Sequence, residues 1–305
     1  MTLDLVAFLR CPICHRRLKG DPAASVSCER CGITYPAGAG ILRMLDDRVP
    51  GIAEKRAEIA GWVELARHQE WYRADDAVDA VLPYVNRDLG WEDEHWLANE
   101  RGFSRLLERI RPGDRVLEVG AAKCWASRHV LDRDAAYVAV DILDDSLIGL
   151  GRGAFYGEFP RIQADGEHLP LADAAFDVTF CVATLHHALD LGAMVRELAR
   201  VTRRGGVVAA LNEGARGWGA SAANPEQEHE RELGINEHVH TVPRYVRAFA
   251  RAGLRQWHVE LTTPEEEWSR RRLVRRVYRW SRPLALALAA IRIPYGGVTI
   301  FARRR

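Results

Sequence analysis

The stretch of residues 115–130 constrains the fold of this chain more than any other. Val116, Leu117 and Val119 form a short, partly β-branched apolar run, which is typical of a strand covered on both faces. Gly120 ends the run, small residues follow it, and apolar residues then recur at helical spacing. A strand that enters a helix through a tight turn brings free backbone N–H groups close to a ligand, so this stretch predicts a nucleotide-cofactor site.

Asp141 ends a second apolar strand at residues 137–141, 21 residues after Gly120. A carboxylate at this place can accept both hydrogen bonds of a ribose diol. Further strands are predicted near residues 161–164, 177–182, 206–212, 257–261 and 298–302, with helical patterns between most of them. This alternation predicts an α/β fold with a doubly wound, Rossmann-like sheet of seven strands.

Two longer stretches carry a resemblance to a known family. Residues 161–188 (RIQADGEHLPLADAAFDVTFCVATLHHA) and 195–213 (VRELARVTRRGGVVAALNE) closely resemble the body of class I S-adenosylmethionine-dependent methyltransferases, in the type 11 or ubiquinone–menaquinone-like branch. Arg204 stands where that family usually has proline. The resemblance covers roughly residues 111–261. It implies S-adenosylmethionine as the cofactor and a last strand that runs antiparallel to the others.

The resemblance also implies which residues contact the cofactor. They are Glu118, Gly120, Ala121 and Ala122 at the first turn, Asp141 at the ribose, and Asp165 with Gly166 at the adenine. An alternative role for Asp141 is the N-cap of a helix beginning near residue 144. The family's turn is usually Gly-x-Gly-x-Gly, and if its middle position needs a positive φ, Ala122 costs on the order of 1 kcal/mol there. A weakly bound cofactor or a loss of catalysis would be consistent with this departure.

A general base is needed only for some methyl acceptors, such as alcohols, phenols and protonated amines. His186 and His187 follow the fourth strand at the carboxyl edge of the sheet, where open α/β folds bind their ligands. Glu213, at the end of the fifth strand, and His238 are further candidates for the catalytic base. At least one of the two adjacent histidines is expected to be structural.

Two cysteine pairs near the N-terminus, Cys11 with Cys14 and Cys28 with Cys31, have the spacing of a four-thiolate zinc site. Four sulfur ligands leave no open position, so the Zn²⁺ is expected to be structural. The segment from about Leu5 to Leu45 resembles the zinc-ribbon protein that activates tRNA and release-factor methyltransferases. If this ribbon is a separate unit, removal of zinc should unfold it and leave the cofactor site intact.

The chain therefore divides into three predicted parts: a zinc ribbon (1–45), a helical connector or lid (46–110), and a class I methyltransferase domain (111–305). Tryptophans gather in the second part, where core packing is favoured over contact with a substrate. A basic and apolar helical insertion is predicted at about 264–296. Its residues 268–291 are interpreted as a packed helix with a solvated basic side, or alternatively as a peripheral membrane contact.

Charge and composition narrow the function. The chain has 43 Lys and Arg against 42 Asp and Glu, so net charge gives no argument for nucleic-acid binding. With no evident signal peptide and no apolar run long enough to span a bilayer, a cytoplasmic protein is expected. The favoured function is methyl transfer to oxygen or nitrogen of a small-molecule metabolite or natural product. Two alternatives are an RNA methyltransferase that uses the ribbon for substrate binding, and an inactive zinc-ribbon scaffold. The sequence leaves the acceptor and the oligomeric state open.

Overall fold

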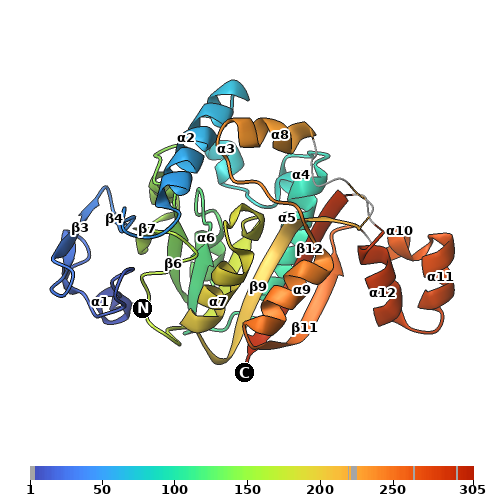
Figure 1. Ribbon diagram of the computed structural model, residues 1–305. Helices are drawn as coiled ribbons and strands as arrows, with labels where there is room; N and C mark the ends of the chain where they lie inside the picture. The colour runs from blue at the N-terminus through green and yellow to red at the C-terminus, as the bar shows by residue number, and fades with distance from the viewer. Residues whose placement is uncertain (1–3, 219, 221–224, 264, 293–294) are drawn as a thin grey trace.

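The computed structural model describes residues 4–218, 220, 225–263, 265–292 and 295–305, and its centre is a twisted mixed sheet (Figure 1). The parallel strands are β7 (Arg161–Gln163), β6 (Ala136–Asp141), β5 (Arg115–Val119), β8 (Phe176–Val182) and β9 (Thr202–Arg216), in that spatial order. β12 (Tyr295–Arg304) lies antiparallel between β9 and β11 (Leu254–Leu261). The predicted α/β class and the antiparallel last strand are confirmed.

The sheet does not stop at seven strands, which corrects the expected count. β4 (Ile41–Arg43) pairs in parallel with β7, and the sheet continues through β3 (Ile33–Gly38), β2 (Ser25–Cys28) and β1 (Lys19–Asp21). A short strand, β10 (His240–Thr241), also pairs with β9, so that 12 strands are joined. The unpaired backbone groups of β7 would otherwise form an open edge, and β4 covers them.

Helices cover both faces of the sheet, as the strict alternation of apolar residues requires. Val116 and Val178 face one core with α5 (Glu94–Leu107) and α6 (Ala126–Leu131). Leu117 and Val119 face the other core with α7 (Leu191–Val201) and α9 (Val242–Arg251). These two layers hold the strand ends rigid, and the site is built on them.

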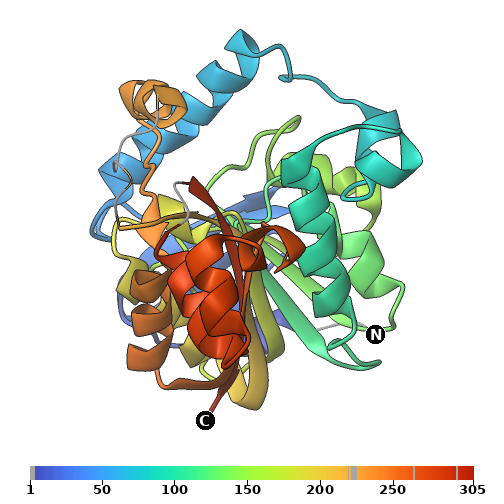
Figure 2. The ribbon, with the colours of Figure 1, turned by 90° about the vertical axis from the view of Figure 1, so that its right-hand side faces the viewer.

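The segment between β4 and β5 contains the helices α2 (Ile52–His68), α3 (Asp76–Asp79), α4 (Val85–Asp88) and α5. α8 (Pro225–Glu232) lies beside α2 in both views (Figures 1 and 2). The remaining short elements are α1 (Leu5–Phe8), η1 (Leu150–Tyr156) and η2 (Leu185–His187). α3 is only four residues long and ends at Asp79.

The insertion near residue 264 is helical as well, with α10 (Glu265–Ser269), α11 (Arg272–Tyr278) and α12 (Arg282–Ala290) between β11 and β12. Figure 1 shows α11 and α12 at the edge of the molecule, beyond the layer that contains α9. Within the described part of the chain, no helix combines the length and the apolar character that a membrane span requires.

Candidate active site

The turn after β5 brings the backbone to the carboxyl edge of the sheet. Gly120 has a φ of +74°, and a Cβ there would lie 2.2 Å from the Thr184 side chain, so this position requires glycine. Ala122 (φ +41°) and Cys124 (φ +63°) also adopt left-handed conformations. The strain expected at Ala122 from the sequence is therefore present.

Asp141 is fixed at the end of β6 by two backbone donors. The N–H of Ala122 donates to its Oδ2 at 2.7 Å, and the N–H of Leu143 donates to its Oδ1 at 2.8 Å. Burial raises the pKa of this carboxyl, and the backbone donors oppose that effect. The alternative role as a helix N-cap is wrong, because a turn and not a helix follows at residues 146–148.

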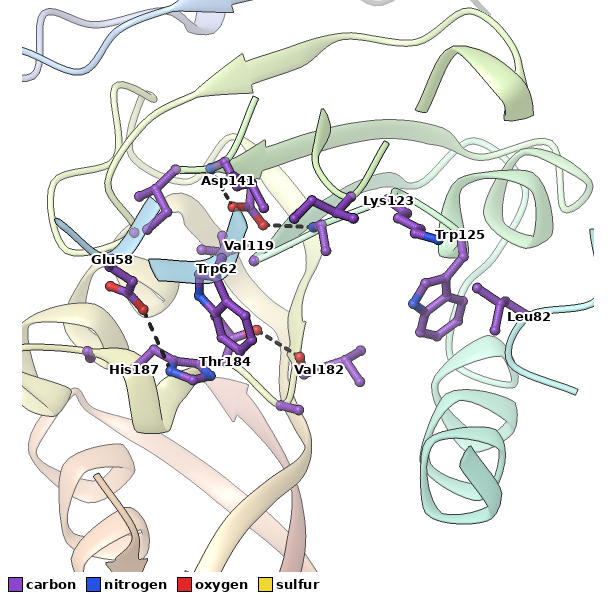
Figure 3. Close-up of a pocket in the computed structure, with 18 of the residues that line it drawn as sticks. Glu58, Trp62, Leu82, Val119, Lys123, Trp125, Asp141, Val182, Thr184 and His187 are labelled. Atoms are coloured by element: carbon purple, nitrogen blue, oxygen red, sulfur yellow. Dashed lines mark hydrogen bonds and ion pairs between the residues drawn. The ribbon is translucent and has the colours of Figure 1, made fainter. Parts of the chain in front are cut away.

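A cavity of about 560 Å³ opens beside this carboxylate (Figure 3). Residues from the strand ends, the η2 loop and the helical connector line it together. They include Gly120, Ala122, Asp141, Asp165, Gly166, Thr184 and His187 from the sheet side, and Lys55, Glu58, Trp62, Trp71, Asp79, Trp91 and Trp96 from the connector. Segments that are far apart in the sequence thus enclose one space.

Five of the seven predicted cofactor residues line the cavity, and Glu118 and Ala121 do not. Glu118 lies buried in β5, where it accepts a hydrogen bond from the hydroxyl of Tyr137. Burial raises the pKa of Glu118 to about 8, so its side chain is largely protonated at neutral pH. Its place beneath the turn is that of a supporting residue, and its role in cofactor binding stays a prediction.

Helix α2 supplies lining residues that sequence reasoning missed. Lys55, Glu58 and Trp62 follow one another at i, i+3 and i+7, so they share one face of the helix, and this face borders the cavity. Four connector tryptophans, Trp62, Trp71, Trp91 and Trp96, also line it. Trp62, Trp71 and Trp96 also pack against hydrophobic clusters, so the favoured interpretation as core side chains holds for them in part, although the same side chains border the cavity. The i, i+3, i+7 spacing of Lys55, Glu58 and Trp62 is the signal that could have identified this face.

Lys55 ties α2 to the loops at the edge of the sheet. Its Nζ donates to the carbonyl oxygen of His187 at 3.0 Å and lies 3.4 Å from Glu58 and 3.5 Å from Glu167. All three charged side chains are buried. Burial raises the pKa of Glu58 to about 7, although the ammonium of Lys55 opposes the shift.

His187 is the one predicted base candidate among the residues that line the cavity. Its Nδ1 lies 2.9 Å from the carbonyl oxygen of Asn236 and 3.6 Å from Glu58 (Figure 3). Because a carbonyl oxygen only accepts, Nδ1 carries the proton and the ring's lone pair is on Nε2. Burial, together with His186, lowers the pKa of His187 well below its usual value, so the ring is neutral at pH 7.

The other three base candidates are not among the residues that line the cavity. Nδ1 of His186 pairs with Glu213 at 2.9 Å, and both side chains are buried. Burial alone would lower the pKa of His186, but the carboxylate of Glu213 outweighs it and raises that pKa. His238 donates its backbone N–H to the carbonyl of His186 at 2.9 Å, and its ring stacks on His240. His238 is itself exposed, and its backbone bond holds the 236–238 segment against the η2 loop.

The four predicted metal ligands lie close together at the end of the sheet that β1, β2 and β3 form. The sulfur atoms of Cys11, Cys14, Cys28 and Cys31 lie within 4.8 Å of one another, and none forms a disulfide. The Cys14–Cys28 and Cys11–Cys31 sulfur pairs are 3.5 and 3.9 Å apart. A tetrahedral zinc ion with bonds of about 2.3 Å separates its sulfur ligands by about 3.8 Å, so the donor set and its spacing fit zinc.

A doubly wound sheet with an acidic residue at the end of its second strand and a cavity at the carboxyl edge defines a class of nucleotide-cofactor proteins. Within this class, residues 117–210 match the family model of the methyltransferase domain. The resemblance seen in the sequence is thus confirmed for this part of the chain. The match does not include the cysteine-rich segment, which comprises residues 5–45 and contains Cys11, Cys14, Cys28 and Cys31.

Individual relatives agree with this assignment. The chain is 33% identical over 135 residues to a demethylmenaquinone methyltransferase of Corynebacterium urealyticum, covering 44% of this chain and 55% of the relative. It is 31% identical over 130 residues to the 27-O-demethylrifamycin SV methyltransferase of Amycolatopsis mediterranei, covering 39% and 47%. The chain therefore spans about half the length of these relatives.

Among solved structures, a geranyl diphosphate methyltransferase in complex with its diphosphate substrate and sinefungin superposes with a TM-score of 0.55. The superposition covers 83% of this chain and all of that one, at 17% identity. At this identity the likeness establishes a shared fold. The Rossmann-like methyltransferase fold therefore extends well beyond residues 117–210.

Proposed function

We propose that this protein binds S-adenosylmethionine in the cavity and transfers the methyl group to oxygen or nitrogen of a small molecule. The observation that carries the proposal is the single enclosed space shared by Gly120, Asp141, Asp165 and the connector tryptophans. The relatives are named for methylation of small molecules, which favours this class of acceptor over RNA.

Each of the lining residues has a place in this proposal. Asp141 holds the ribose hydroxyls, since each of its oxygens accepts one backbone N–H and keeps a free lone pair. Asp165 and Gly166 border the adenine, and the turn at Gly120 leaves room for the methionyl part. When bound, the cofactor supplies an electrophilic methyl group, and the protein's main task is to orient the acceptor toward it.

His187 is proposed to accept the acceptor's proton at Nε2. Its neutral ring and the fixed proton on Nδ1 leave Nε2 as the basic atom, and Nε2 has no hydrogen-bond partner among the described residues. The carboxylates of Glu58 and Glu237, at 3.6 and 3.3 Å from Nδ1, would stabilise the imidazolium that forms. His186, Glu213 and His238 are proposed to position this ring.

The four cysteines are proposed to hold a structural Zn²⁺. Their sulfur spacing supports this, and four thiolates leave no coordination position for a reacting ligand. The cation would therefore stabilise the segment that contains β1 to β3 and take no part in methyl transfer.

The first test is calorimetric titration of S-adenosylmethionine into the protein and into Asp141→Ala. Loss of two charge-assisted hydrogen bonds should weaken binding by roughly 100-fold. Asp132→Ala, which removes an equally charged but exposed residue, is the matched control and should bind like the wild type. Equal affinities for all three proteins would refute the assignment of Asp141.

The second test identifies the acceptor class. Protein, methyl-labelled S-adenosylmethionine and a cell extract are incubated, and the label is measured in RNA, protein, lipid and small-molecule fractions. Label in the small-molecule or lipid fraction supports the proposal. Label in RNA would establish the alternative of an RNA methyltransferase, and no transfer despite cofactor binding would favour the inactive scaffold.

A further inference from the structure

The C-terminal part of the chain has an extreme distribution of charge. Residues 268–305 contain 11 arginines and no aspartate or glutamate, although the whole chain has a net charge of only +1. Seven of these arginines lie between Trp268 and Arg282, in the segment that forms α11 and the ends of its neighbours. A positive charge of this density is a feature of one region and not of the protein as a whole.

The helices α11 and α12 form a hairpin, the α11–α12 hairpin (272–290), whose inner side joins the hydrophobic core. Val274, Ala285 and Ala289 are buried in it, and Trp268 of α10 packs beside them. Small side chains on α12 let the two helices approach closely. Packing against the rest of the protein therefore explains the apolar residues on the inner side of the hairpin. It does not explain the residues on the outer side.

The outer side of the hairpin combines arginines with large apolar side chains. Arg275, Arg276 and Arg279 are exposed and form no ion pair with any side chain that the structure describes, a set that does not include those of residues 266 and 267. Trp280 is 92% exposed and Leu284 is 64% exposed, at the turn between the two helices. Leu273 and Tyr278 are also exposed. Figure 1 shows the α11–α12 hairpin at the outer edge of the molecule.

This combination matches the interface of a lipid bilayer. Tryptophan places its ring at the level of the headgroups, leucine inserts into the acyl region, and arginines bind the phosphates of anionic lipids. A surface for RNA would share the arginines but has no use for exposed leucines, because base stacking needs aromatic rings. No described helix is suited to cross the bilayer, so the contact would be peripheral.

We propose that the α11–α12 hairpin docks the protein on the surface of an anionic phospholipid bilayer, with Trp280 and Leu284 inserted and the arginines on the headgroups. The attraction to anionic lipid brings the hairpin to the surface, and the apolar turn retains it there. The proposal does not depend on catalysis and concerns a surface distinct from the cavity.

The test is co-sedimentation with vesicles of phosphatidylcholine alone and with vesicles in which about one lipid in three is phosphatidylglycerol. The full-length protein should sediment with the anionic vesicles only, and added salt should release it. Arg275→Glu with Arg276→Glu should reduce the partition coefficient at least about tenfold. Trp280→Ala with Leu284→Ala should reduce it about tenfold as well, because it removes the inserted side chains.

A matched control changes charge elsewhere by the same amount. Arg133→Glu with Arg204→Glu alters two exposed arginines outside the hairpin and should leave vesicle binding within about twofold of wild type, since screening limits long-range attraction. All the substituted side chains are exposed, so circular dichroism and thermal unfolding should be unchanged. Equal loss of binding in control and hairpin variants would overturn the proposal, as would absence of vesicle binding by the wild type.

A parallel titration with single-stranded homopolymeric RNA separates the two chemistries. Binding of RNA but not of vesicles, lost in the arginine variant, would overturn the proposal in favour of a nucleic-acid surface. Binding of anionic vesicles that needs both the arginines and the apolar turn supports it.

Discussion

Ala122 has a left-handed backbone (φ +41°) where the methyltransferase family usually has glycine, so this turn, which lines the cavity, stores strain. We expect Ala122→Gly to increase the free energy of unfolding by about 1 kcal/mol, because glycine removes the Cβ from this conformation. Urea denaturation monitored by circular dichroism measures the change.

The neighbouring alanine is the control for this substitution. Ala121 is buried and does not have a positive φ, so Ala121→Gly should lower the free energy of unfolding by about 1 kcal/mol through added chain entropy. If both variants shift stability in the same direction, strain at Ala122 is not the cause.

Glu58 gives the proposed reaction a pH dependence. Its pKa is raised to about 7, mainly by burial, so its carboxylate forms as the pH rises through 7 and can then stabilise a protonated His187. We expect kcat/KM of the wild type to rise across this range. Glu58→Gln should remove this acid limb and lower kcat about tenfold or more, with little change in KM.

Glu64→Gln is the matched control, because Glu64 is exposed on the same helix and, among the described residues, forms an ion pair with His68 alone. Its pH profile should equal that of the wild type. An unchanged profile in Glu58→Gln would show that the carboxylate does not act on His187.

At the scale of elements, α2 depends on one buried ammonium group. Replacing Lys55 by Met leaves the carboxylates of Glu58 and Glu167 without their cation. This should lower the free energy of unfolding by about 3 kcal/mol. Hydrogen exchange should then speed up in α2 while β5 and β6 stay protected. Arg56→Met breaks an exposed ion pair with Asp47 and should change neither the free energy of unfolding nor the hydrogen exchange of α2 by much. Faster exchange throughout the sheet would mean that Lys55 stabilises the whole domain and does not specifically tether α2.

The strands of the domain could be predicted from the sequence because each is a short apolar run whose alternate residues enter two different cores. The helical connector was predicted as helix, but its contribution to the cavity was not. Lys55, Glu58 and Asp79 are charged residues that hydrophobic periodicity assigns to solvent. They are buried because each meets a partner from a distant segment, such as Arg152 at 2.7 Å from Asp79.

The place of Asp141 and the convergence of the four cysteines followed from spacing, because local chain geometry determines both. The spacing of residues does not predict which of the four base candidates borders the cavity. That depends on how the 236–238 segment packs on η2, where Asn236 fixes the ring of His187 and His238 hydrogen-bonds the backbone of His186. Such long-range contacts have no periodic signature in the sequence.

At the scale of the whole molecule, the cysteine-rich segment and the methyltransferase domain share one sheet. β4 pairs with β7 from Ile41 to Arg43, and the N–H of Met44 donates to the carbonyl of Gln163 at 2.8 Å. On the other side, the N–H of Arg10 donates to the carbonyl of Pro170 at 2.8 Å. The part of the chain that carries Asp165 and Gly166 is thus flanked by two contacts with the cysteine-rich segment, at Gln163 and at Pro170.

This connection reverses the expectation that the segment is separable. If the four cysteines hold zinc, its removal should unfold β1 to β3 and release both ends of the Asp165 loop. We expect chelation to weaken S-adenosylmethionine binding about tenfold or more in a calorimetric titration. Part of the binding free energy is then used to order the loop. Hydrogen exchange should speed up in β7 and residues 164–172 but not in β8 or β9. Chelator already saturated with zinc should have no effect, and added zinc should restore affinity. Full affinity in a protein whose first strands exchange freely would show that the cofactor loop is held by the domain alone.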